Sequence, residues 1–178
     1  MNNTAVDTEG AWFEPDRISE LRRRLPIPYV DIVPVRTDTD GTISQVGLLL
    51  RASGTGRIVR AIVSGRVLVH ETLREAIARN VEKDLGPMAL PRIPVAPQPF
   101  TVAEYFPTPG QSLFTDPRQH AISLAYIVPV DGETAPQEDA LDLAWCSVPE
   151  LLDSGMLEEM EGGHDIIVRR ALAHGGLI

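Results

Sequence analysis

The 178-residue sequence contains one cysteine, Cys146, so it cannot form an internal disulfide bond. Aromatic residues make up 5% of the chain, and no apolar run reaches the roughly 18 residues that a membrane span needs. The first ten residues, MNNTAVDTEG, lack the basic and then apolar stretches of a secretory signal. These absences predict a protein of a reducing compartment, most simply the cytoplasm, that does not enter a membrane.

Basic residues are also scarce, with 16 Lys and Arg against 25 Asp and Glu, a formal net charge of -9. Such a chain repels phosphate backbones, so nucleic-acid binding is not expected unless basic residues cluster. The one short cluster, at residues 22–24 in ISELRRRL, is interpreted as a solvated helix face. Net acidity does not exclude a small anionic ligand, because a local cleft can differ in sign from the whole surface.

The order of helical and extended patterns predicts an α/β (α+β) fold, a mixed β-sheet covered by helices on both faces. Residues 1–28 are expected to form an N-terminal tail and a short helix at 15–25, and residues 29–178 a single domain. Alternating or continuous apolar patterns predict strands at 29–38, 45–52, 57–65, 100–106, 120–130 and 140–148. Further helices are predicted at 72–85, 149–155 and from 164 or 165 to 174.

The helix predicted at 72–85 has signals at both ends. Thr72 and Glu75 have the spacing of a capping box, and Gly86 followed by Pro87 predicts a left-handed cap and a stop. Between them lies an apolar stripe with a spacing of four residues, at Leu73, Ile77, Val81 and Leu85.

The segment from residue 65 to 86 resembles the Nudix box, whose pattern is G, five residues, E, seven residues and then R-E-U-x-E-E-x-G-U, where U is a bulky aliphatic. Five positions match, namely Gly65, Glu71, Arg79, Val81 and Gly86. Outside the box, QVGLLLR (45–51), DPRQHAISLAYIVPV (116–130), LAWCSVPELLD (143–153) and HDIIVRRALA (164–173) resemble further pieces of the family in the right order. The resemblance implies a Nudix fold over roughly residues 29–174.

The departures from the box concern its metal ligands. In a Nudix hydrolase the helix glutamates bind divalent cations, usually magnesium, which activate water and screen the diphosphate. Asn80 stands at the first of these positions, and Lys83 and Asp84 stand at the later pair. Their spacing places all three on one helix stripe, from which Glu82 points away. An ammonium at this stripe could replace the charge of the metal and hold an anionic ligand without hydrolysing it.

The resemblance therefore implies a set of candidate site residues. Catalytic positions are Glu71, Asn80 and Asp84, with His70 as a proton carrier; ligand-binding positions are Arg66, Arg79 and Lys83; metal positions are Asp84 and Asp139. Some of these residues could instead have a purely structural role. Glu71 and Arg79 could form an ion pair that anchors the box loop, and Lys83 could be a solvated lysine. The loop acids Asp116, Glu138 and Asp139 are either solvated charges or an outside carboxylate, and Cys146 is expected in the core.

Three functions remain open. The first is a Nudix-fold module with a degenerate box that binds a phosphorylated or nucleotide-like small molecule, with no cofactor or weakly bound Mg or Mn. The second is a divalent-metal-dependent hydrolase of a nucleoside diphosphate linked to another group, with a rearranged metal site. The third is a protein interaction module using the Pro-rich segment 87–118, and a homodimer through the N-terminal segment is a further expectation. The first ranks above the second, because function lies in the site and not in the fold.

Overall fold

The computed structural model describes residues 15–53, 56–137 and 140–178, so the tail predicted before the helix at 15–25 lies outside the described residues. The helices are α1 (Pro15–Arg22), α2 (Leu73–Leu85), α3 (Val148–Asp153) and α4 (His164–His174), with a 3-10 turn η1 (Met156–Glu159). The strands are β1 (Ile27–Thr37), β2 (Ile43–Ala52), β3 (Ile58–Ala61), β4 (Val63–Arg66), β5 (Thr101–Phe106), β6 (Phe114–Thr115), β7 (Ala121–Pro129) and β8 (Ala140–Ser147). No helix among them is long and apolar enough to cross a membrane.

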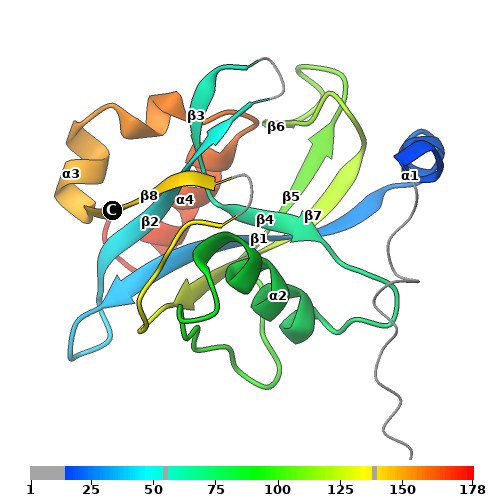
Figure 1. Ribbon diagram of the computed structural model, residues 1–178. Helices are drawn as coiled ribbons and strands as arrows, with labels where there is room; N and C mark the ends of the chain where they lie inside the picture. The colour runs from blue at the N-terminus through cyan, green and yellow to red at the C-terminus, as the bar shows by residue number, and fades with distance from the viewer. Residues whose placement is uncertain (1–14, 54–55, 138–139) are drawn as a thin grey trace, which may run out of the picture.

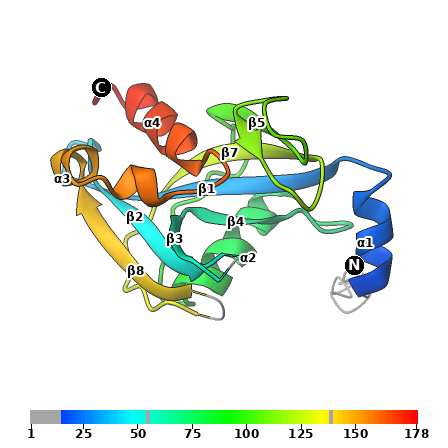
Figure 2. The same ribbon diagram turned by 90° about the horizontal axis from the view of Figure 1, so that it is seen from above.

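The strands form one sheet in the order β3-β2-β1-β7-β5-β6, with β4 paired to β1 and β8 paired to β2. β1 and β7 run parallel, whereas β1 pairs antiparallel with β2 and β4. Figure 1 shows this curled sheet with α2 in front of it, and Figure 2 shows α2 and α4 on opposite sides. The predicted mixed sheet between helices is confirmed.

Each face of the sheet carries its own hydrophobic core. Alternate residues of β1 point to opposite faces, so that Val30 and Ile32 pack in the core under α2 while Val33 and Val35 pack in the core under α4. The register between β1 and β2 shifts only near the end of β1, between Arg36 and Thr37, so this alternation is unbroken through the buried middle of the strand. Cys146 lies in the α4 core, as predicted.

The strand predicted at 120–130 is interior to the sheet. It appears as β7, which pairs with β1 along nine residue pairs, from Ile27 and Ala121 to Val35 and Pro129, and with β5 on its other edge. The small side chains Ala121 and Ala125 lie in the core under α4, and Tyr126 lies in the core under α2.

The extended segment predicted at 57–65 is two strands rather than one. β3 pairs with β2, and after Ile62 the chain moves to β1, where β4 pairs with residues 29–32. Ile62 is fully buried in the α4 core at this change of partner. Apolar periodicity reports which face is buried and not which neighbour a strand pairs with, so the break was not predicted.

α1 is shorter than the helix predicted at 15–25. It ends at Arg22, and Leu25, which the prediction made the last helical residue, is 55% exposed. Pro26 follows, and the residue before a proline is disfavoured in helical geometry. The backbone preference of Leu25, the residue before Pro26, therefore ends the helix earlier than the pattern of apolar residues predicted.

α2 has the predicted N-terminal cap. The Thr72 hydroxyl accepts a hydrogen bond from the Glu75 amide, and the Glu75 carboxylate accepts one from the Thr72 amide. At the other end, Gly86 has a positive φ of 90° but a ψ of 162°, so it is not the left-handed helical cap that the sequence predicted. Its amide still donates to the Glu82 carbonyl, and the chain leaves the helix extended toward Pro87.

Candidate functional site

The box loop is fixed to α2 by a bidentate ion pair. Arg79 Nε lies 2.6 Å from Glu71 Oε1, and Arg79 Nη2 lies 2.8 Å from Glu71 Oε2. The Leu68 amide donates to the same Glu71 oxygen at 2.9 Å, and Arg79 also donates to the Arg66 carbonyl at 2.7 Å. The ion pair expected as the structural alternative is present, and both Glu71 oxygens accept hydrogen bonds from the protein.

Asn80 fills the space above the box glycine. Its side chain is buried, and its Nδ2 donates to the Ala76 carbonyl one turn earlier at 2.8 Å. A Cβ atom placed on Gly65 would lie 1.8 Å from Asn80 Oδ1, so only glycine fits below this amide. The first box position therefore holds a neutral amide packed into the interface between α2 and β4.

Asp84 lies between two cations. The carboxylate is 1% exposed and forms ion pairs with Arg51 from the end of β2 and with the neighbouring Lys83, whose Nζ is 3.3 Å from Asp84 Oδ1. The side chains of Arg51 and Lys83 remain 21% and 27% exposed, so each can also meet a ligand. Asn80, Lys83 and Asp84 share one face of α2, and Glu82 is exposed, as the helix geometry predicted.

Arg51 was not among the predicted site residues. The sequence places it in an apolar strand, and nothing local connects it to position 84. The alternation of side chains along a strand could have indicated its position. Arg51 lies two residues after Leu49, so it shares the face of β2 that packs under α2. Only the curl of the sheet brings this strand end over the helix.

The loop after β7 covers the C-terminal end of α2. The Ala135 amide donates to the Leu85 carbonyl at 2.9 Å, and the Gln137 amide donates to the Asp84 carbonyl at 3.3 Å. Glu138 and Asp139 follow directly but lie outside the described residues, so the metal role predicted for Asp139 stays a prediction. Asp116, the third loop acid, accepts hydrogen bonds from the side chains of Arg118 and Gln119.

Two other predicted site residues are set apart from this helix face. His70 is exposed in the box loop at a positive φ of 64°. Arg66 is the cross-strand neighbour of Tyr29, which packs against the core under α4. The Arg66 side chain therefore projects from the face of β4 opposite α2, whereas Gly65 beside it faces Asn80.

A second buried carboxylate, Asp31, was not predicted. Ser64 Oγ donates to its Oδ1 at 2.6 Å, and the Tyr105 hydroxyl donates to its Oδ2 at 2.8 Å. Burial first, and then the Asp31 charge, raise the pKa of Tyr105 well above its usual value. The His164 ring lies edge-on to Tyr105 at 6.3 Å between centroids, and burial lowers the pKa of His164. This cluster joins β1, β4, β5 and α4.

The chemistry of the α2 face can be compared with what a divalent cation needs. Magnesium prefers several hard oxygen ligands and is opposed by nearby positive charge. The three box positions supply one amide, one ammonium and one carboxylate that already faces two cations. Among residues 15–53, 56–137 and 140–178, no group of three or more His, Cys, Asp or Glu side chains is arranged to hold a metal ion.

Comparisons with known proteins agree with this architecture. A family model described as "Domain of unknown function (DUF4916)" matches residues 8–177. No curated protein matches the sequence. A crystal structure from Jonesia denitrificans, named as a possible asymmetric diadenosine tetraphosphate (Ap4A) hydrolase, is 56% identical, with a TM-score of 0.84 over 87% of this chain and 98% of that chain.

More distant structures share the fold. The NUDIX domain of Shewanella oneidensis NrtR, complexed with ADP ribose, is 15% identical, with a TM-score of 0.62 over 98% of this chain and 99% of that chain. The MutT protein from Methanosarcina mazei is 18% identical, with a TM-score of 0.57 over 85% of this chain and 97% of that chain.

The contact between Gly65 and Asn80 predicts a coupled pair of substitutions. Gly65→Ala should destabilise the protein by about 1–3 kcal/mol, because its Cβ would meet a packed amide. In the Asn80→Ala background the same change should cost at least about 1 kcal/mol less, since the obstructing side chain is gone. Urea unfolding of the wild type, both single variants and the double variant measures this coupling, and additive effects would contradict the contact.

The environment of His164 predicts a pH dependence of stability. Its folded pKa is lowered below the ordinary 6.5, so the unfolded chain binds more protons and stability falls as the pH falls through this pKa window. The pKa of His164 is lowered further by the positive charge of Arg51. The negative charges of Asp31, Asp116 and Asp165 raise it in part. Urea unfolding between pH 7.5 and 5 should show a contribution of at most about 1.4 kcal/mol per pH unit that is absent in His164→Asn. His70→Asn removes an exposed histidine as the control, and an equal slope in wild type and His164→Asn would contradict the prediction.

Proposed function

This chain belongs to the DUF4916 family and to the Nudix superfamily, and on that premise we propose that it binds a phosphorylated, nucleotide-like small molecule without efficient metal-dependent hydrolysis. The observation that carries the proposal is the pairing of Asp84 with Arg51 and Lys83. Two cations of the protein face Asp84, the one carboxylate among the three helix positions that depart from the box.

The charge balance at this face opposes a divalent ion. Two opposite unit charges at about 4 Å attract by roughly 4 kcal/mol at an effective dielectric constant of 20, and like charges repel equally. The Arg51 guanidinium already forms an ion pair with Asp84, so a metal at Asp84 would have to displace it. Asn80 offers only an amide oxygen turned toward Gly65. These residues do not fit the metal that the family uses, and no catalytic step is assigned to one.

The same charges suit an anionic ligand. Arg51 and Lys83 neutralise Asp84 and retain exposed surface. Arg51 Nε and Nη2 are buried, so a phosphate would be met by Lys83 Nζ and by the rest of the Arg51 guanidinium. Arg79 is committed to Glu71 and holds the box loop in place, so its role is to position the loop. A nucleotide-like ligand is supported by the NrtR domain, whose structure contains ADP ribose.

A metal-dependent hydrolase of a linked nucleotide is the second candidate. It is favoured by the 56% identical Jonesia denitrificans protein, which is named as a possible Ap4A hydrolase. Such an enzyme would use Asp84, Glu71 and a loop acid such as Asp139. The hydrogen bonds on both Glu71 oxygens count against this candidate, because a metal would compete with Arg79 and the Leu68 amide.

Metal binding to α2 tests the proposal. Replacing Asn80, Lys83 and Asp84 together with Glu should raise affinity for manganese by at least about tenfold, because each change adds or extends a carboxylate and Lys83→Glu reverses a charge. Calorimetric titration compares the triple variant with wild type. Arg74→Glu is the control, since it reverses an exposed charge on the same helix away from the face. Equal affinities in wild type and the triple variant would mean that this face is not the metal position.

A nucleotide-release assay distinguishes the binding function from the hydrolase function. Wild-type protein incubated with Ap4A or ADP-ribose and magnesium should release no nucleotide above the level without enzyme, while binding of either compound is detected by calorimetry in chelator. Chelator-sensitive turnover of about 1 per second or more, an ordinary enzymatic rate, would replace the binding proposal with the hydrolase.

A further inference from the structure

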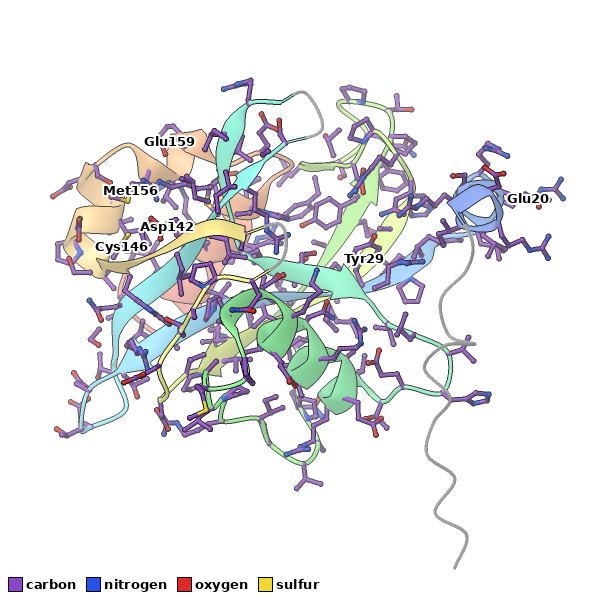
Figure 3. All side chains as sticks on the ribbon, in the orientation of Figure 1. Glu20, Tyr29, Asp142, Cys146, Met156 and Glu159 are labelled. Atoms are coloured by element: carbon purple, nitrogen blue, oxygen red, sulfur yellow. The ribbon has the colours of Figure 1, made fainter. Side chains whose placement is uncertain are left out.

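Trp145 on β8 packs against the hydrophobic core under α2, and its ring is fixed by two neighbouring strands. Figure 3 labels Cys146, the next residue along β8. A Cβ atom placed on Gly47 of β2 would be 3.2 Å from the Trp145 ring and 3.1 Å from the Pro34 side chain, so the ring lies directly on the backbone. The Arg36 guanidinium approaches the ring from β1, with its Cζ atom 4.5 Å from the ring centroid, which is the geometry of a cation–π contact.

Arg36 and Trp145 also hold the loop after β7. The two terminal nitrogens of Arg36 donate hydrogen bonds to the carbonyls of Val130 and Gly132, the second at 2.6 Å. Further along this loop, Trp145 Nε1 donates to Thr134 Oγ1 at 3.1 Å. The planar, charged guanidinium can donate to two carbonyls while it stacks on an aromatic ring, which a smaller cation cannot do. The start of the loop is therefore fixed to β1 and β8.

The other end of the same loop is fixed to α2. A Cβ atom on Gly132 would lie 1.8 Å from the Met88 carbonyl oxygen, so the loop approaches the segment after α2 as closely as only glycine allows. The loop amides that follow donate to the carbonyls of Leu85 and Asp84. Figure 1 shows this segment, in yellow between β7 and β8, beside the end of α2. The last carbonyls of a helix have no partner within it, so these bonds order the last turn of α2.

We propose that Arg36 is a positioning residue for the α2 face. It holds the loop after β7 on Trp145, and the loop holds the last turn of α2, which carries Lys83 and Asp84. A residue that supports a binding group in this way affects affinity without touching the ligand. The inference rests on the proposed function, because it concerns the same face, and it adds that binding depends on a side chain from β1.

Calorimetric titration with ADP-ribose in chelator tests this role. Arg36→Gln should weaken binding by about fivefold or more, because the loop loses two charge-assisted hydrogen bonds and the last turn of α2 becomes less ordered. Arg36→Lys should not restore the affinity, since an ammonium does not reproduce the planar, two-carbonyl geometry. Arg92→Gln is the matched control. It removes the same charge from a 54% exposed side chain that pairs with Asp131 in the same loop, and it should leave the affinity within about twofold.

A double variant distinguishes positioning from a general loss of stability. Lys83→Gln removes one of the two cations of the α2 face, and Arg51 still offers the other. In this background Arg36→Gln should weaken binding by less than about twofold further, because two changes that act through one shared group are not additive. Thermal unfolding shows whether each variant is folded. If Arg36→Gln is not, Thr134→Val decides, since it removes only the hydroxyl that accepts from Trp145 and should weaken binding by about threefold.

Fluorescence reports on the Arg36 contact directly. The chain has two tryptophans, so in a Trp12→Phe background all tryptophan emission comes from Trp145. Arg36→Gln should shift this emission, because the ring loses the guanidinium beside it, whereas Arg92→Gln should leave it unchanged.

Weaker binding in Arg36→Gln that is not additive with Lys83→Gln, together with shifted Trp145 emission, supports the inference. Additive losses, an equal loss in Arg92→Gln, restored affinity in Arg36→Lys or unchanged emission in Arg36→Gln each overturn it and leave the proposed function standing. If the wild type binds no ADP-ribose at millimolar concentration, the proposed function fails first and the inference fails with it.

Discussion

The ion pair between Asp84 and Arg51 joins the two parts of the molecule on which the site depends. Asp84 comes from α2 and Arg51 from the far end of β2, so the pair fixes the helix against the curl of the sheet. Removing one partner from a buried pair is costly, because the other charge is left without compensation. Lys83 shares the carboxylate. The arrangement therefore places two positive charges of the protein beside the buried carboxylate.

The box keeps its shape although its metal positions have changed. Glu71 and Arg79 link the loop to α2, and Asn80 packs against Gly65 at the distance that only glycine permits. These are structural contacts, and each uses a residue at a box position. Retention of the strand, loop and helix is thus explained by packing alone. The proposed binding role depends separately on positions 80, 83 and 84, so family membership and activity are different questions for this chain.

The two faces of β4 carry different chemistry. Gly65 faces Asn80 on α2, while Ser64 and Arg66 face the side of Asp31 and Tyr29. A strand that alternates in this way separates the α2 face from the buried Asp31 cluster on the other side of the sheet. An acidic protein can therefore present local positive charge at the α2 face, which its overall charge does not describe.

The sequence by itself determined the local structure of this protein. The cap at Thr72, the apolar stripe of α2 and the interior strand at 120–130 follow from hydrogen-bonding and burial patterns between residues close in the chain. It also placed Asn80, Lys83 and Asp84 on one face, since helix geometry is periodic. Only the tertiary structure decided that Arg51 meets Asp84, that the segment 57–65 changes partner at Ile62, and that Arg66 projects away from the helix. Those outcomes depend on how strands pair and curl over long sequence separations, and no local pattern encodes them.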